Sequence, residues 1–228
     1  MSDASSPVAI VTGASRGIGR ATANQLSRLG WRVAAVARST ISADGMLSLA
    51  FDIKTSEACR KVVAETVKAF GRIDALVNNA GYAPLLSIEQ TTDEVWQQAI
   101  DTNLSAAFYL SRACWPEFKK QGGGVIVNVS SAAARDPFAG FIAYGAAKAA
   151  LNNLGLSLAR EGANDNIRVH TIAPSATETE MFRNLPGMAN YPTESTMSPD
   201  DVAGVIVQCI AGELSLTSGE VIYLHKGA

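Results

Sequence analysis

A tyrosine and a lysine four residues apart are the side chains of this sequence best suited to proton transfer. Tyr144 and Lys148 lie in an alanine-rich run that predicts a helix, so both side chains project from one helical face. A free phenol has a pKa of about 10, and a nearby ammonium group favours the phenolate and lowers that value. The pair is therefore able to exchange a proton with a hydroxyl or carbonyl oxygen. Because the same spacing arises by chance on many amphipathic helices, the pair needs support from other residues.

Two serines give that support. Ser130 and Ser131 follow an apolar run that predicts a strand, and they would lie at the carboxyl edge of a parallel sheet, where open α/β proteins bind ligands. A hydroxyl at that edge can donate a hydrogen bond to a substrate oxygen on which negative charge develops. A serine that ends a strand also serves as a helix cap, which is the structural alternative for one of the two.

A glycine-rich turn follows the first predicted strand and leads into a helix. Its glycines permit a tight turn and a close approach of the backbone to a pyrophosphate, and the helix N-terminus offers unpaired N–H groups to that anion. The spacing of the glycines differs from the common G-x-G-x-x-G fingerprint. The residues expected to hold the pyrophosphate are Gly13, Ser15, Arg16, Gly17, Ile18 and Gly19.

The end of the second predicted strand indicates which dinucleotide is bound. Proteins that bind NAD carry an acidic residue about 20 residues beyond the glycines, where it holds the 2′-hydroxyl of the adenosine ribose. This sequence has Arg38 and Ser39 there, and the guanidinium group would bind the 2′-phosphate of NADP(H), with Arg16 adding a second positive charge. The alternative is that Arg38 is a solvated residue at a strand end.

Alternating strands and helices must position these residues. Short runs rich in valine and isoleucine alternate with longer segments of helical periodicity, which is the pattern of a parallel sheet covered on both faces. The predicted strands are Val8–Val11, Arg32–Ala37, Leu47–Phe51, Ala75–Val77, Gly124–Val129, Arg168–Ile172 and Glu220–Leu224. The predicted helices are Gly17–Leu29, Ser56–Phe70, Thr92–Lys119, Ala143–Glu161 and Pro199–Ala211, the last capped by Ser198. We therefore expect an α/β protein with a three-layer, doubly wound Rossmann fold and a seven-stranded, mainly parallel sheet.

The length of the chain limits the number of domains. Its 228 residues suffice for one large α/β domain but not for an additional substrate domain of ordinary size, so we expect a single domain over residues 1–228. The irregular segment Met181–Met197 is a candidate lid over the substrate, because a loop of that length late in a compact domain is more often functional than idle. The crossover from Arg38 to Leu47 is short, so its helix is expected to be abbreviated or absent.

Composition argues against several other classes of protein. The 19 Lys+Arg and 21 Asp+Glu give a formal net charge of −2, which is unlike a nucleic-acid-coating surface. No apolar run approaches the roughly 18 residues that cross a bilayer, and the N-terminal residues do not resemble a signal peptide, so we expect a cytoplasmic protein without membrane or nucleic-acid partners. The 3 cysteines form no CxxC pair and are expected to be reduced core thiols. The 2 histidines are too few for a His-based zinc site, and we expect no metal; His170 is assigned to a strand.

Together these motifs resemble those of the short-chain dehydrogenases/reductases, in the single-domain branch with a Tyr-x-x-x-Lys pair. The resemblance covers essentially the whole chain. It depends on Thr12-Gly13-x-x-x-Gly17-Ile18-Gly19, Asp52-Ile53, Asn78-Asn79-Ala80-Gly81, Asn103, Ser131 and Tyr144-x-x-x-Lys148. Positions 131 and 144 lie 13 apart, which matches the family pattern and selects Ser131 over Ser130.

The resemblance implies a role for each matching position. Tyr144 would be the general acid/base, Lys148 would lower the pKa of Tyr144 and hold the nicotinamide ribose, and Ser131 would orient the substrate oxygen. Asn103 would hold a water in a proton relay. The cofactor-binding residues that the resemblance implies beyond the glycine-rich turn, Arg38 and Ser39 are Asp52, Ile53, Asn79, Ala80, Gly81, Tyr144, Lys148, Pro174, Thr177 and Thr179.

The sequence departs from the family pattern at two places besides the shortened crossover after Arg38. After the sixth strand, Ser175 replaces a glycine and Thr177 an aliphatic residue, which affects the expected binding of the nicotinamide carboxamide. Near the end, His225-Lys226-Gly227 replaces Asp-Gly-Gly, in a segment that commonly packs at a subunit interface of the family. By the resemblance, a homodimer or homotetramer is expected, paired through the long helices at Thr92–Lys119 and Ala143–Glu161.

The expected function is that of an NADP(H)-dependent enzyme that transfers a hydride between nicotinamide and a small-molecule carbonyl or secondary alcohol, with Tyr144 as general acid/base. One alternative is an NADPH-binding redox sensor or scaffold without turnover, which has no need of the full catalytic set. Another is a sugar-nucleotide epimerase or dehydratase, for whose usual extra substrate region this chain is too short. The side chains that would line an apolar substrate pocket are Tyr82, Phe138, Phe141, Met181 and Phe182.

Overall fold

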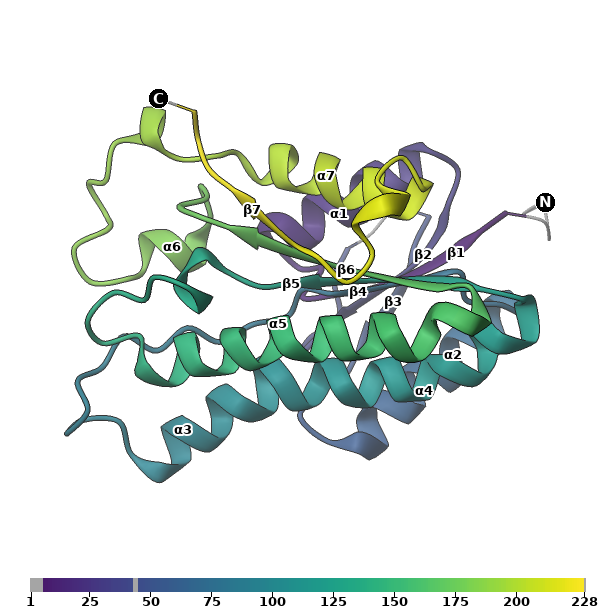
Figure 1. Ribbon diagram of the computed structural model, residues 1–228, viewed down its shortest axis with the longest axis horizontal. Coiled ribbons are helices and arrows are strands. Elements are labelled where there is room, and N and C mark those ends of the chain that lie inside the picture. The colour runs from purple at the N-terminus through teal and green to yellow at the C-terminus, as the bar shows by residue number, and fades with distance from the viewer. Residues whose placement is uncertain (1–5, 43–44, 228) are drawn as a thin grey trace.

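The computed structural model of the protein describes residues 6–42 and 45–227 (Figure 1). Residues 1–5, on which the expectation about a signal peptide rests, lie outside the described residues, as do residues 43 and 44 of the short crossover and the last residue of the expected domain, 228. No helix in the described part of the chain is both long and apolar enough to span a bilayer.

A seven-stranded sheet runs through the centre of the molecule. Every neighbouring pair of strands is parallel, in the order β3-β2-β1-β4-β5-β6-β7. The strands are β1 (Val8–Thr12), β2 (Arg32–Ala37), β3 (Leu47–Ala50), β4 (Ala75–Asn78), β5 (Gly124–Val129), β6 (Ile167–Pro174) and β7 (Val221–Leu224). The predicted doubly wound sheet is confirmed, and the predicted strand ends differ from these by one or two residues at most.

Helices cover both faces of this sheet and make three layers (Figure 1). On one face lie α1 (Gly17–Arg28) and α7 (Pro199–Ala211), and on the other lie α2 (Ser56–Phe70), α4 (Ala106–Gln121) and α5 (Ile142–Gly162). Successive strand residues point to opposite faces, so Ala9 and Val11 enter the core beneath α1 and α7, whereas Ile10 enters the core beneath α2 and α4. Both faces of the five central strands, β1, β2, β4, β5 and β6, are buried, which is why their predicted sequences are nearly continuous apolar runs.

Polar residues at helix starts define where the helices begin. The Ser198 hydroxyl accepts a hydrogen bond from the Asp201 N–H (3.1 Å), and the Asp201 carboxylate accepts one from the Ser198 N–H (3.0 Å), which is a capping box. This confirms the predicted start of α7. Thr55 and Thr92 cap α2 and α3 (Asp93–Ile100) in the simpler way, by accepting from one backbone N–H each.

The single helix predicted over Thr92–Lys119 is wrong in its middle. The structure has α3 (Asp93–Ile100), then a π-helical turn (Asp101–Ser105), then α4. In that turn the side-chain amide of Asn103 donates to the carbonyl oxygen of Ala99, four residues earlier (2.9 Å). This is the acceptor that a regular helix would pair with the Asn103 backbone N–H, so the backbone hydrogen bonds shift by one residue.

The two irregular segments have different structures. The described residues between β2 and β3 contain no helix, as expected; instead the Ile41 N–H donates to the Ser48 hydroxyl (3.1 Å). The candidate lid contains most of a short helix, α6 (Glu180–Arg183), and a 3₁₀ turn at Thr193–Ser195. α6 lies beyond the carboxyl ends of the central strands, above the site described below (Figure 1).

The cysteines and the strand histidine belong to the core. All three cysteines are free and buried, and burial raises their thiol pKa values. His170 lies on β6 as predicted, with its Nδ1 3.0 Å from the Thr217 hydroxyl, and burial lowers the pKa of its ring to about 4. These side chains are therefore uncharged packing groups at neutral pH.

A substitution in the glycine-rich turn tests how closely the turn is packed. A Cβ added at Gly19 would collide with the side-chain nitrogen of Asn79 and the carbonyl oxygen of Gly13, whereas one added at Gly204 in α7 would meet nothing within 4 Å. We expect Gly19→Ala to lower the free energy of unfolding by about 1–3 kcal/mol, and Gly204→Ala, the matched control, to raise it by up to about 1 kcal/mol. Denaturant unfolding measures the free energy of unfolding of both variants. Equal values for Gly19→Ala and the wild type would show that the turn rearranges to accommodate the added methyl group.

Candidate active site

One cavity of about 540 Å³ lies along the carboxyl edge of the sheet. It receives a residue from the end of each of six neighbouring strands. In spatial order from β3 to β6 these residues are Asp52, Arg38, Gly13, Asn79, Ser131 and Pro174. The parallel register brings these positions, which are far apart in the sequence, into one row.

The cavity unites most of the residues singled out from the sequence. Three of them do not line it: Gly19 packs beneath the glycine-rich turn, Ser39 is exposed, and Asn103 is buried beside the cavity. The residues that do line it are Gly13, Ser15, Arg16, Gly17, Ile18, Arg38, Asp52, Ile53, Asn79, Ala80, Gly81, Ser131, Tyr144, Lys148, Pro174, Thr177 and Thr179. The five expected substrate-pocket side chains also line it.

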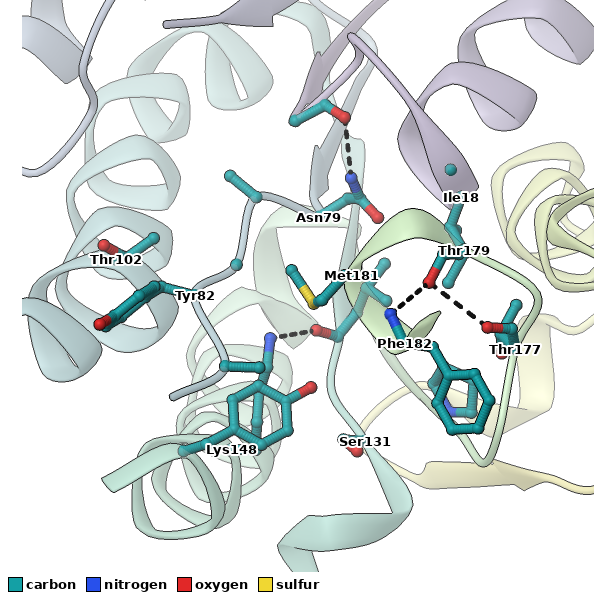
Figure 2. Close-up of a pocket in the computed structure, with 18 of the residues that line it drawn as sticks. Ile18, Asn79, Tyr82, Thr102, Ser131, Lys148, Thr177, Thr179, Met181 and Phe182 are labelled. Carbon is teal, nitrogen blue, oxygen red and sulfur yellow. Dashed lines mark hydrogen bonds between the residues drawn. The ribbon is translucent and has the colours of Figure 1, made fainter. Parts of the chain in front are cut away.

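Thr12 and Asn79 hold the glycine-rich turn against the end of β4. The Thr12 hydroxyl accepts hydrogen bonds from the backbone N–H groups of Asn79 (2.9 Å) and Ala80 (3.0 Å), and the Asn79 amide donates to the Thr12 carbonyl (2.8 Å) (Figure 2). A Cβ at Gly13 would lie 2.9 Å from Ala80 Cα, and the positive φ of Gly13 (+66°) also favours glycine there. The side-chain amide of Asn79 therefore packs against the glycine-rich turn and fixes its conformation through hydrogen bonds.

Unpaired donors begin the helix that follows this turn. The N-cap position of α1 is Arg16, which provides no side-chain acceptor for the N–H groups of the first helical turn. Gly17 and Ile18 of that turn line the cavity. A helix N-terminus with free N–H groups is a binding site for a phosphate or another anion.

Charged residues gather at the end of the cavity formed by β2 and β3. Arg38 follows β2 and is exposed. Asp52, which follows β3, forms an ion pair with Lys54 (3.0 Å), and Arg16 forms one with Glu180 of α6. The sequence analysis did not single out Lys54 or Glu180, because both lie outside the motifs and their pairing requires the tertiary fold.

Ser130, Ser131 and Lys148 have distinct hydrogen-bonding roles. The Ser130 hydroxyl donates to the Lys148 backbone carbonyl (3.2 Å) and so ties the end of β5 to α5. The Ser131 hydroxyl accepts from the Ala133 N–H (3.2 Å), and it also forms a hydrogen bond with Tyr144. The Lys148 ammonium donates to the Val129 carbonyl (2.8 Å) and lies 5.7 Å from the centre of the Tyr144 ring. The alternative role of a serine as a helix cap thus applies to Ser131, whose hydroxyl oxygen caps the short 3₁₀ turn that follows it.

Burial is the largest influence on the acidities of Tyr144 and Lys148. It raises the pKa of Tyr144, and the hydrogen bond with Ser131 offsets only part of that increase. It lowers the pKa of Lys148 to about 7. The expectation that the lysine lowers the pKa of the phenol is therefore not met in this structure, because desolvation disfavours both charged forms. Tyr144 is a protonated phenol at neutral pH.

Asn103 positions the segment that follows β4. Its amide donates to the carbonyl oxygens of Tyr82 (2.8 Å) and Ala99, and its side-chain oxygen accepts from the Tyr82 N–H (3.2 Å). Both hydrogens of the amide are thus used within the protein. The structure assigns this side chain to holding Tyr82 at the cavity wall, and a role in a water relay stays a prediction.

Arg183 makes several contacts that hold the lid in one conformation. Arg183 forms a bidentate ion pair with Glu178 (2.6 and 2.7 Å), and it donates further hydrogen bonds to the carbonyl oxygens of Met188, Ala189 and Tyr191 and to the Thr193 hydroxyl. The sequence analysis missed this pair, since a Glu and an Arg five residues apart carry no motif. The ion pair gives the irregular lid a defined shape.

Aromatic side chains and two methionines, Met181 and Met188, line the opposite end of the cavity from the charged residues. The rings of Phe138, Phe141 and Tyr144 follow one another with centroid distances of 5.8 and 5.2 Å. From the lid, Phe182 packs edge-on against Tyr191 (5.4 Å). Figure 2 shows Met181 in the middle of the cavity, between Asn79 and Lys148.

Comparisons with known proteins agree with this geometry. The family model for the short chain dehydrogenase matches residues 7–190. The chain is 32% identical over 236 residues to an acetoacetyl-CoA reductase of Shinella zoogloeoides, covering 97% of this chain and 98% of that protein.

Two solved structures have the same fold over nearly the whole chain. One is a 3-ketoacyl-(acyl-carrier-protein) reductase from Brucella melitensis complexed with NADH (TM-score 0.91, 26% identity, 99% of each chain). The other is the aldohexose dehydrogenase of Thermoplasma acidophilum in ligand-free form (TM-score 0.90, 27% identity, 99% of this chain and 95% of that one).

Removal of the arginine that fastens the lid tests its role. We expect Arg183→Ala to increase the rate of proteolytic cleavage within residues 184–196 by about tenfold, because the hydrogen bonds that hold this segment closed are lost. Arg160→Ala, at an exposed arginine near the end of α5, is the matched control. Mass spectrometry of limited digests measures the cleavage, and an unchanged rate would show that other contacts hold the lid.

Proposed function

The chain belongs to the short-chain dehydrogenase/reductase family, and on this premise we propose that it is an NADP(H)-dependent oxidoreductase that acts on a carbonyl or secondary alcohol. The family makes it an oxidoreductase with a nicotinamide cofactor. NADP(H) as that cofactor, and Tyr144 as the general acid/base, are the finer points of the proposal.

The order of residues along the sheet edge is the observation that supports this proposal best. Residues suited to adenosine (Asp52, Arg38), to a pyrophosphate (Gly13 and the start of α1) and to the reacting oxygen (Ser131) follow one another from β3 to β5. The groups of an extended dinucleotide follow one another in the same order. The unpaired N–H groups at the start of α1 lie in the middle of that row, where its pyrophosphate would lie.

The positive charges at the β2 end support NADP(H) over NAD(H). Arg38 is exposed at the cavity wall, where the guanidinium group is free to pair with a 2′-phosphate. The acidic residue that would hold a 2′-hydroxyl is absent from that position. Arg16 would add a second cation only by leaving Glu180.

The catalytic residues act on the substrate oxygen. Bound NADP(H) supplies or accepts the hydride. In the reducing direction the protonated phenol of Tyr144 delivers a proton to the carbonyl oxygen, which suits its raised pKa. The Ser131 hydroxyl donates a hydrogen bond to the same oxygen as negative charge develops, and Lys148 stabilises the phenolate that Tyr144 becomes. Pro174, Thr177 and Thr179 would lie beside the nicotinamide.

Two further properties complete the proposal. We propose a cytoplasmic enzyme that forms a homodimer or homotetramer through α4 and α5, as members of the family commonly do. The exposed Trp96 on α3 and Phe108 on α4 support an interface there, because large apolar side chains on a surface favour contact with a partner.

Removing the Tyr144 hydroxyl tests its role in catalysis. We expect Tyr144→Phe to lower kcat for ketone reduction by about 100-fold or more while NADPH still binds, because the proton donor is lost and the ring is kept. Tyr109→Phe, at a tyrosine of α4 outside the cavity, is the matched control. Full activity of Tyr144→Phe would contradict the assignment, and tight NADPH binding without turnover of any carbonyl would favour the sensor alternative.

The wild-type enzyme should depend on pH. Its rate of ketone reduction should fall as the pH rises through about 7, where Lys148 loses its proton.

Charge reversal at Arg38 tests the choice of cofactor. We expect Arg38→Asp to weaken NADPH binding about tenfold to a hundredfold, because a charge-assisted hydrogen bond is lost, and to change NADH binding much less. Arg160→Asp makes the same change of charge outside the cavity. Fluorescence titration with both cofactors measures the ratio of their Kd values, and an unchanged ratio overturns the proposed contact with the 2′-phosphate.

A further inference from the structure

We propose that the substrate is an uncharged, largely hydrophobic ketone or secondary alcohol, and that the site rejects substrates with a carboxylate near the carbonyl. The inference rests on the proposed function and adds the chemical class of the substrate. It follows from how apolar groups and charges divide the cavity between its two ends.

The end of the cavity beyond Tyr144 is lined mainly by apolar groups. They come from three segments, the loop after β4, the loop before α5 and the lid, and enclose a space beside the Ser131 hydroxyl. Three of them are exposed although they are apolar: Phe138 (64%), Tyr191 (37%) and Met181 (36%). A cluster of exposed apolar side chains around a cavity favours an apolar ligand that covers it. The apolar lining residues are Tyr82, Phe138, Phe141, Met181, Phe182, Leu185, Met188 and Tyr191.

The exposed cations of the cavity lie away from this end, and the one cation beside Tyr144, Lys148, is buried. Among the described residues that line it, Arg38 and Lys54 are at β2 and β3, at least three strand spacings, or about 14 Å, from the end of β5. Arg16 is paired with Glu180, and the Lys148 ammonium donates to the Val129 carbonyl. None of the four is placed to pair with an anionic group on the substrate.

Two other arginines close to this end in sequence point elsewhere. Arg183 is held by Glu178 and by carbonyl oxygens of the lid. Arg135, which follows Ser131 by one turn, lies over the ring of Tyr223 at 4.0 Å. Neither of them lines the cavity, whereas Asp136 does. A substrate carboxylate would therefore meet an acidic side chain and no cation.

The energetic consequence separates charged from uncharged substrates. Moving a charge from water into an apolar site without a partner costs several kcal/mol, whereas apolar surface gains free energy on the same transfer. The few polar side chains at this end, Gln98, Thr102 and Asn184, suffice to orient one or two polar groups but not the many hydroxyls of a sugar. The inferred substrate thus differs from those named for the acetoacetyl-CoA reductase and the aldohexose dehydrogenase to which this chain is similar.

A matched pair of aromatic ketones tests the inference. 4-Methylacetophenone and 4-acetylbenzoate have the same carbonyl and ring and differ in one carboxylate. In the reaction, NADPH gives a hydride to the carbonyl carbon and Tyr144 gives a proton to the oxygen. Tyr144 then recovers a proton from water, so one ketone, one NADPH and one proton become one alcohol and one NADP⁺. We expect kcat/KM for the methyl ketone to exceed that for the carboxylate by about 30-fold or more. Acetoacetyl-CoA and glucose, with NADP⁺ for the latter, are expected to be poorer substrates than the methyl ketone.

Two pairs of variants connect this preference to the lining. Asp136→Lys places a cation at the cavity, and we expect it to raise kcat/KM for 4-acetylbenzoate about tenfold; Glu89→Lys makes the same change of charge at an exposed site outside the cavity. Phe138→Ala is expected to raise KM for 4-methylacetophenone about fivefold or more with little change in kcat. Leu29→Ala, at a residue of matching exposure (63%) outside the cavity, is the control.

Binding measurements separate this inference from the proposed function. Calorimetric titration of both ketones into the enzyme saturated with NADP⁺ reports their affinities without turnover. Tighter binding of the methyl ketone with no turnover of any substrate would contradict the proposed function and support the inferred class. Equal or better binding and turnover of 4-acetylbenzoate, acetoacetyl-CoA or glucose would overturn the inferred class and leave the proposed function intact.

Discussion

Seven strands that all run in one direction impose the constraint on which this site depends. In a parallel sheet every strand delivers its carboxyl end to the same edge, so loops that are far apart in the sequence must share one cavity. The strand order then decides which loops are neighbours. Because β1 lies between β2 and β4, the glycine-rich turn has Arg38 on one side and Asn79 on the other. The hydrogen bonds between Thr12, Asn79 and Ala80 join β1 to β4 at this edge and hold the turn open for a ligand.

Desolvation governs the chemistry of the catalytic end. Tyr144 and Lys148 lie at the edge of the core, where water solvates neither charged form well. The phenol therefore stays protonated, and the Lys148 amine is a weaker base than usual. Their proximity alone would predict the opposite shift for the tyrosine. In the proposed reaction the phenol of Tyr144 gives the proton. Ser131 lies beside it, and Ser130 ties the end of β5 to the helix that carries Tyr144 and Lys148.

The lid divides one cavity into two chemical environments. The two residues just before it contact the glycine-rich turn: a Cβ at Gly17 would lie 3.2 Å from the Thr179 methyl group, and Glu180 pairs with Arg16. Its outer part presents Met181, Phe182 and Tyr191 to the opposite end. The ion pair between Arg183 and Glu178 joins these parts, so the polar end and the apolar end are set by the same short segment.

The sequence by itself determined the strands, the glycine-rich turn and the N-cap of α7, and it singled out Ser131, Tyr144 and Lys148, because each depends on residue type and local spacing. Only the tertiary structure decided the π-helical turn at Asn103, which depends on contacts with Tyr82, 21 residues away. The pairs Arg16–Glu180 and Arg183–Glu178 and the direction of the Tyr144 pKa shift also required it. Ion pairs between segments and the loss of water on burial depend on which surfaces meet in space, and local sequence does not encode that.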